Sequence, residues 1–241
     1  MTDKSHPCLG KGTAQPTNDP PQSICLAFLA GYVDTLGFIA LFGVFTAHVT
    51  GNFILIGREL AHPTQGVLIR LLAFPAFIVS VAGTRLLILF LQRHEKCVLF
   101  YIYIVQFFLL AGFAVSGYLA GPAITPDMPW ALLASVLGAA AMAMQNASAK
   151  LLLSHIPPST IMTGNVTQLV INFVDFARGA ASEKEVHALR GLLWTVAAFA
   201  CGAIGAGFGY GAFGFVALVL PCLMLLWLAW HARQQDSSSP P

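Results

Sequence analysis

Charged side chains are scarce in this sequence, and their scarcity excludes a water-soluble globule. Only 9% of the 241 residues are charged, whereas soluble domains carry about a quarter. Hydrophobic residues make up 57%, and the few charges cluster between apolar stretches whose lengths suit a hydrocarbon core about 30 Å thick. The composition therefore predicts an integral membrane protein of the helical type, with the lipid bilayer as its main partner.

Motifs that would indicate catalysis are missing as well. The sequence contains no HExxH, GxSxG or Walker-type loop, and its five cysteines show no CxxC spacing. The net charge of +2 indicates neither a nucleic acid nor an acidic partner. We therefore expect no enzyme activity, no metal, no cofactor and no nucleic-acid partner.

Long apolar stretches are what the sequence does contain. Six of them approach the roughly 20 residues that a spanning helix needs; they are residues 24–45, 67–91, 98–120, 130–153, 189–210 and 212–230. Two shorter stretches, 47–60 and 161–176, are interrupted by Thr-Gly-Asn. These two are either half-helices that enter and leave the membrane or short, broken crossings. The fold class is thus a polytopic all-α membrane protein.

The two ends of the chain are polar. Residues 1–23 are rich in Pro, Ser, Thr, Asn and Gln, which predicts a disordered tail, and residues 233–241 predict a second polar tail. The first apolar stretch starts late and contains Asp34, so we interpret it as a retained helix rather than a signal peptide.

Loop charges test the topology, because Lys and Arg accumulate on the cytoplasmic side. If the two short stretches do not cross, nine loop or tail Lys and Arg residues lie on one side, and Arg58 and Arg70 lie on the other. If both cross, the division is eight to three. Both counts place the two termini in the cytoplasm, and the difference slightly favours short stretches that do not cross.

A pattern recurs in the two halves, residues 24–120 and 121–232. Thr50-Gly51-Asn52 returns as Thr163-Gly164-Asn165, 113 residues later. Each tripeptide follows a long apolar stretch with polar residues, which are Asp34 in the first half and Gln145 and Asn146 in the second. The pattern predicts two copies of a four-segment unit, inverted if the short stretches do not cross and parallel if they do. Paired interruptions of this kind indicate a central substrate site in transporters.

Each Thr-Gly-Asn is expected to break its helix, because glycine weakens helix continuity and frees backbone groups. The Thr hydroxyl and Asn amide can cap the broken ends, and the N-terminus of a half-helix can attract an anionic group. Alternatively, both tripeptides are capped turns that only hold the fold together.

Several polar side chains at membrane depth need partners or water. Asp34 and Arg85 either pair with each other, or Asp34 takes up and releases a proton during transport. His48 is either protonatable or a hydrogen-bonded structural residue. A polar stripe on the second short stretch fits a water-lined path or a seam against another helix; it comprises Asn165, Gln168, Asn172 and Asp175.

Glycines spaced as GxxxG between Gly202 and Gly214 let helix backbones approach closely. We favour packing within the chain over a dimer interface, and a homo-oligomer remains the alternative.

Three segments carry a family resemblance: residues 30–34 (AGYVD), 45–52 (FTAHVTGN) and 162–168 (MTGNVTQ). With Gln145-Asn146 between them, they resemble the signature of the YoaK-like family of small bacterial membrane proteins, over about residues 24–230. The resemblance implies a multi-helix fold in the bacterial inner membrane and no particular substrate.

Together these features lead to the hypothesis of a transporter or permease for a small solute. Its site would lie between the two copies, formed by the two tripeptides, Asp34 and the amides of Gln145, Asn146, Gln168 and Asn172. The alternative is a non-transporting membrane protein whose polar residues lock helices together.

Overall fold

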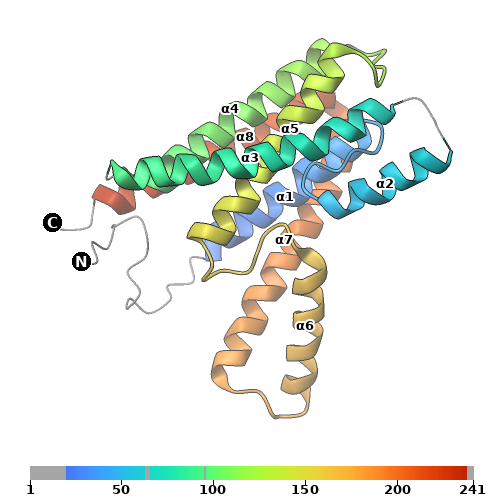
Figure 1. The fold of residues 1–241 in the computed structure, drawn as a ribbon. Helices are drawn as coiled ribbons and strands as arrows, with labels where there is room; N and C mark the ends of the chain where they lie inside the picture. The colour runs from blue at the N-terminus through green and yellow to red at the C-terminus, as the bar shows by residue number, and fades with distance from the viewer. Residues whose placement is uncertain (1–19, 63–65, 95, 238–241) are drawn as a thin grey trace.

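All of the secondary structure in the described residues is helical. The computed structural model describes residues 20–62, 66–94 and 96–237. Its helices are α1 (Pro20–Ala40), α2 (Val49–Ala61), α3 (Val67–Arg93), α4 (Val98–Leu119), α5 (Pro129–Leu152), α6 (Met162–Ala177), α7 (Glu183–Phe213), the short 3-10 helix η1 (Gly214–Leu218) and α8 (Val219–Ser237) (Figure 1). The predicted all-α fold class is confirmed.

Five helical segments of the described chain are long and apolar enough to cross a membrane. They are α1, α3, α4, α5 and the stretch 183–235, which holds α7, η1 and α8 and therefore both of the last two predicted spans. Left-handed Gly214, with a φ of 56°, and η1 separate α7 from α8. Helices α2 and α6 are too short to qualify. These features are those of a multi-pass membrane protein.

The helix ends differ from prediction at three places. Helix α1 begins at Pro20 and α8 continues to Ser237, so residues 20–23 and 233–237 are helical rather than tails; the remaining tail residues, 1–19 and 238–241, lie outside the described residues. Helix α7 begins at Glu183 instead of residue 189. The Ser182 backbone N–H donates to the Glu185 carboxylate at 2.7 Å, and the Glu185 N–H donates to the Ser182 hydroxyl at 3.4 Å. This capping box starts the helix early.

The helices of the two halves pack crosswise. Helix α1 packs along α7, and α5 packs along α3, so the first helix of each half lies on the third helix of the other. Helix α4 packs on α5 and α8. Large side chains such as Leu26, Leu36, Tyr103 and Phe113 are fully buried between these helices. The two short helices lie outside this core, α2 on α3 and α6 on α7 (Figure 1).

Helix directions follow from contacts near the helix ends. Helices α1 and α7 are parallel, because the Ser23 and Thr195 hydroxyls lie 3.0 Å apart and, further along α1, the Tyr32 hydroxyl donates to the carbonyl of Ala217 in η1, just after the end of α7. Helices α4 and α8 are antiparallel. The Cys97 thiol before α4 donates to the Ala232 carbonyl near the end of α8 at 3.6 Å, and the Phe215 ring in η1 lies against Gly117 near the end of α4.

Glycine allows α1 and α7 to cross closely. A Cβ atom at Gly31 would overlap the backbone carbonyl of Phe199, and one at Gly202 would overlap that of Phe28. Gly207 on α7, by contrast, faces open space. The predicted packing within the chain is therefore confirmed at Gly202.

Candidate functional site

Two irregular segments separate a long helix from a short one in each half. The first connector, residues 41–48, joins α1 to α2, and the second connector, residues 153–161, joins α5 to α6. Each connector is held by the long helix before it and by the short helix after it. Most of the predicted site residues belong to these attachments.

Asp34 on α1 holds the first connector. Its Oδ1 accepts hydrogen bonds from the Ala47 N–H at 2.7 Å and the Thr46 hydroxyl at 3.3 Å, while its Oδ2 lies 2.5 Å from Nδ1 of His48. Asp34 is buried, whereas the His48 side chain is 35% exposed. The hydrogen bond to Asp34 raises the pKa of His48 above its ordinary value, against the opposing effect of partial burial. The pair therefore offers a half-exposed imidazole that can exchange a proton.

The predicted ion pair between Asp34 and Arg85 is wrong. Arg85 lies on an exposed face of α3, and the Asp34 carboxylate is occupied by the connector. The chain folds back after α1, through Phe42 in the left-handed region at a φ of 57°, and brings His48 within reach from fourteen residues away. The proton-carrying role of Asp34 stays a prediction.

Gln145 and Asn146 on α5 hold the second connector with neutral groups. The Gln145 amide donates to the Ser159 hydroxyl at 2.9 Å and to the Leu26 carbonyl at 2.8 Å. The Asn146 amide donates to the Thr160 hydroxyl at 2.8 Å, again across fourteen residues. This attachment resembles that of Asp34 in reach and position, but it contains no titratable group.

A buried glutamine on α4 supports this attachment. The Gln106 amide donates to Oε1 of Gln145 at 2.9 Å, and its own Oε1 finds no partner among the described residues although the side chain is fully buried. A buried acceptor without a donor costs about 1–3 kcal/mol. Gln106 was not among the predicted site residues, because one glutamine in a long apolar helix gives no signal of its own.

Asn52 and Asn165 attach each short helix to its connector. The Asn52 amide donates to the Phe45 carbonyl at 2.7 Å and its Oδ1 accepts from the Phe45 N–H at 3.0 Å. The Asn165 amide donates to the carbonyl of Pro158 at 2.7 Å, also seven residues earlier. Proline has no N–H, so the second half makes one bond where the first makes two.

The two tripeptides do not break their helices, contrary to prediction. Each occupies the first turn of α2 or α6, and Thr50 and Thr163 are exposed there. Because the adjoining irregular backbone lies in the connectors, the asparagines bond to the connectors instead of capping broken helix ends. Gly51 lies against the Phe45 ring, whereas Gly164 meets only Ile161 at an ordinary distance.

One residue at each attachment, His48 and Asn165, lies near α7. The His48 ring centroid lies 6.2 Å from that of Phe199 on α7, and Asn165 lines a cavity together with Trp194 of the same helix. Figure 1 shows α2 and α6 starting toward the middle of the molecule and leading outward in different directions. Both attachments therefore lie beside α7, and a central site between the two halves stays a prediction.

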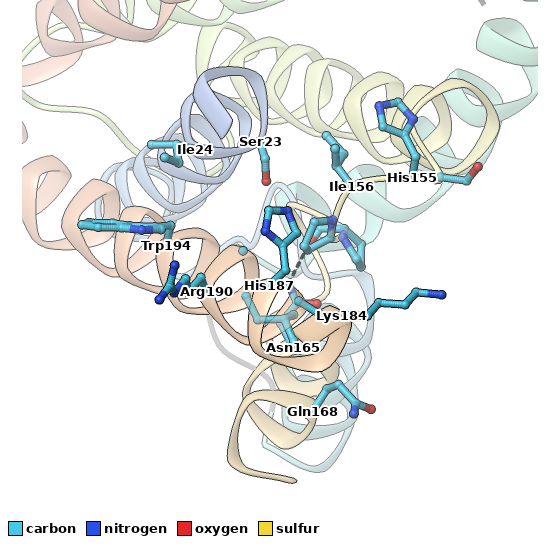
Figure 2. A pocket seen from close by; sticks show the side chains of 16 residues that line it. Ser23, Ile24, His155, Ile156, Asn165, Gln168, Lys184, His187, Arg190 and Trp194 are labelled. Atoms are coloured by element: carbon cyan, nitrogen blue, oxygen red, sulfur yellow. Dashed lines mark hydrogen bonds between the residues drawn. The ribbon is translucent and has the colours of Figure 1, made fainter. Parts of the chain in front are cut away.

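A cavity of about 730 Å³ opens between the second connector, α6, α7 and the start of α1 (Figure 2). Asn165 and Gln168 of the predicted stripe line this cavity; Asn172 does not, but it accepts a hydrogen bond from Gln168 at 2.7 Å. Asp34 and His48 are not among the described residues that line it. Lining residues that sequence reasoning missed include Lys184, His187 and Arg190, whose steps of three along α7 were available as a signal.

A buried ion pair was missed as well. Arg70 on α3 pairs with Glu59 on α2, and its second guanidinium nitrogen donates to the Phe42 carbonyl at 2.6 Å. Both side chains are buried. The pair joins α2, α3 and the first connector, and Glu59, the only acidic residue of the stretch 47–60, was its signal in the sequence.

Comparison with known families decides the affiliation. Residues 22–231 match the family described as "Protein of unknown function (DUF1275)". The chain belongs to the DUF1275 family. The DUF1275 match runs from the start of α1 almost to the end of α8 and includes both connectors. No curated protein and no solved structure matches the chain. The narrower YoaK-like assignment and the bacterial origin stay predictions.

Proposed function

We propose that this DUF1275 protein is a transporter of a small solute, built as an inverted repeat, with its pathway at the two connectors. The observation that carries the proposal is the recurrence of one arrangement in both halves. Each half has a long helix, a connector held across fourteen residues, and a short helix whose asparagine bonds seven residues back. Secondary transporters bind their substrates at paired, interrupted segments of this kind.

Helix directions support the inverted arrangement. If neither short helix crosses the membrane, α1 and α7 must be parallel and α4 and α8 antiparallel, as their contacts require. If both crossed, α4 and α8 would run in the same direction. We therefore infer six crossings. The distribution of Lys and Arg in the sequence then favours cytoplasmic termini, and we propose the inner membrane of a bacterium as the location.

The Asp34–His48 pair supplies a candidate for proton coupling. The His48 imidazole is partly exposed and can take up a proton, and the buried Asp34 carboxylate holds the first connector to α1. A change of protonation would alter the charge of the groups that fix this connector. We propose that solute movement depends on pH through this pair, and that the protein performs no covalent chemistry.

The test begins with purified protein and a thermal-shift screen of metabolites and xenobiotics, because a ligand of the folded state raises its apparent stability. Stabilising solutes are then loaded into proteoliposomes and their flux is followed at several pH values. Asp34→Asn should flatten the pH profile of flux, and Asp127→Asn, which changes an exposed carboxylate in the α4–α5 loop, should leave it unchanged. Failure of every stabilising solute to move would overturn the proposal.

A non-transporting role is the second candidate, because the asparagine amides already bond within the chain. In that case Asn52→Ala and Asn165→Ala would lower thermal stability and expression together. A transporter would instead give folded variants of altered flux.

A further inference from the structure

The described side chains that line the cavity beside α6 and α7 include basic residues and no acidic ones. His155, Lys184, His187 and Arg190 all line it, and none of the described lining residues is Asp or Glu. Glu185, an acidic residue on the same helix as Lys184, is bonded to Ser182 in the capping box and does not line the cavity. Figure 2 shows Arg190 on one side of the cavity, and His155 and Lys184 on the other. An anionic group placed between them would meet positive charge from more than one direction.

The rest of the cavity wall is apolar. Ile24 from α1, Ile156 from the second connector, and Leu192 and Trp194 from α7 all line it. Figure 2 shows Trp194 on the same side as Arg190, one helical turn further along α7. A bare inorganic anion would leave this surface unused, whereas a neutral apolar solute would leave the cations unused. The cavity wall therefore fits a molecule that has both an anionic group and an apolar part.

We propose that this cavity binds an amphipathic organic anion, a carboxylate or phosphate that carries an alkyl or aryl part. Lys184 and Arg190 contact the anionic head, and Trp194 packs against the apolar part. The volume of about 730 Å³ lies within the range of about 300–1,000 Å³ that is usual for small-molecule sites. As the assignment of a transported substrate, this inference rests on the proposed function, whereas the binding itself does not.

Two sources supply this chemistry: a dissolved organic acid and the headgroup region of an anionic lipid. Calorimetry on the full chain in nanodiscs of zwitterionic lipid separates them. The probes are 4-phenylbutyrate, its neutral counterpart 4-phenylbutanol, inorganic phosphate, and short-chain dihexanoyl phosphatidylglycerol. We expect 4-phenylbutyrate to bind more tightly than the alcohol and more tightly than phosphate, because only it satisfies both the cations and the apolar wall.

The decisive variant is Lys184→Gln with Arg190→Gln. It should weaken 4-phenylbutyrate binding about tenfold or more, because charge-assisted hydrogen bonds are among the stronger ones. Arg178→Gln is the matched control: this residue is exposed on the same hairpin but does not line the cavity, so its affinity should stay within about twofold. Thermal unfolding of each variant shows that it is folded.

The other possible results of the calorimetry either support or overturn the assignment of the cavity as an anion site. Tight binding of phosphatidylglycerol alone, lost in the double variant, supports the anion site and identifies a lipid as its source. Equal binding of acid and alcohol, unchanged affinity in the double variant, or no binding of any probe overturns it. Binding of 4-phenylbutyrate without flux of any stabilising solute in proteoliposomes would refute the proposed transport and leave the cavity assignment intact.

Discussion

His48 makes the attachment of the first connector to Asp34 dependent on protonation. Its imidazole lies beside the buried Asp34 carboxylate, and the hydrogen bond between them raises the pKa of His48. A histidine with a raised folded-state pKa stabilises the protein below its unfolded pKa, and this stabilisation is lost as pH rises through the folded value. The first connector is therefore held more firmly in acid.

His48→Gln tests this sign. We expect the wild type to exceed the variant in stability by about 1 kcal/mol near pH 6, with solvent screening of the half-exposed ring taken into account. The difference should shrink toward alkaline pH. Thermal unfolding in detergent across this range provides the measurement, with His62→Gln at the exposed end of α2 as control. Parallel pH profiles for wild type and His48→Gln would contradict the prediction.

The two tripeptide glycines should respond differently to the same substitution. A Cβ at Gly51 would press on the Phe45 ring, so Gly51→Ala should cost about 1–3 kcal/mol. A Cβ at Gly164 meets only Ile161 at an ordinary distance, so Gly164→Ala should be neutral or gain up to about 1 kcal/mol in helix propensity. Unfolding of both variants under one condition measures the two effects. Equal effects would contradict the prediction by showing that the two glycines have similar environments.

Side-chain partners were the least predictable feature at this scale. The membrane cost of a lone Asp34 required a partner, but the choice of His48 over Arg85 depends on the backbone turn through Phe42. A bulky residue with positive φ is rare, so the turn was not visible in the sequence. The polar stripe, by contrast, was visible from its spacing, and two of its members line the cavity.

At the scale of the helices, the first prediction concerns the buried ion pair between α2 and α3. Arg70→Met leaves the Glu59 carboxylate buried without its partner and should cost about 3–5 kcal/mol. The double variant Glu59→Gln with Arg70→Met removes both charges and should recover much of that loss. Chemical unfolding of the single and double variants measures the coupling. A double variant as unstable as the single one would argue against a paired role.

The crossing of α1 and α7 makes a second prediction about elements. Gly31→Ala and Gly202→Ala each force a methyl group into the backbone of the other helix, which should cost about 3 kcal/mol or abolish folding. Gly207→Ala on the open face of α7 is the control and should be tolerated. Expression and thermal stability give the readout, and a tolerated Gly31→Ala would mean that the two helices can separate.

Helix existence and position were predictable for a simple reason. In a bilayer every backbone polar group must be satisfied within the helix, so long apolar stretches have one outcome. The predicted start of the second span at residue 67 coincides with that of α3. The early start of α7 was missed because the Ser182–Glu185 capping box acts outside the apolar stretch that defined the prediction.

At the scale of the whole molecule, the topology is open to direct labelling. With six crossings, the end of α2 and the end of α6 lie on opposite sides of the membrane; with eight, they lie on the same side. Single cysteines at His62 and Arg178, placed in a cysteine-free background, should therefore react with a membrane-impermeant maleimide from opposite sides. Labelling of both from one side would refute the inverted arrangement.

The sequence predicted a two-fold pattern, but it did not predict how the helices of the two halves pack. The recurrence of one tripeptide with similar surroundings indicated two copies. The crosswise contacts of α1 with α7 and of α5 with α3 depend instead on complementary helix surfaces. The role of the asparagines also differed from prediction, because they attach the connectors instead of lining a break.

The unequal attachments of the two connectors have a directional consequence. In the proposed topology the first connector is nearer the face opposite the termini, and the second is nearer the cytoplasmic face. Acid in the outer compartment meets the imidazole of His48 that holds the first connector, whereas the bonds that hold the second connector are made by amides and hydroxyls. In the proposed topology, protons would thus act on the attachment of a connector from the outer side only.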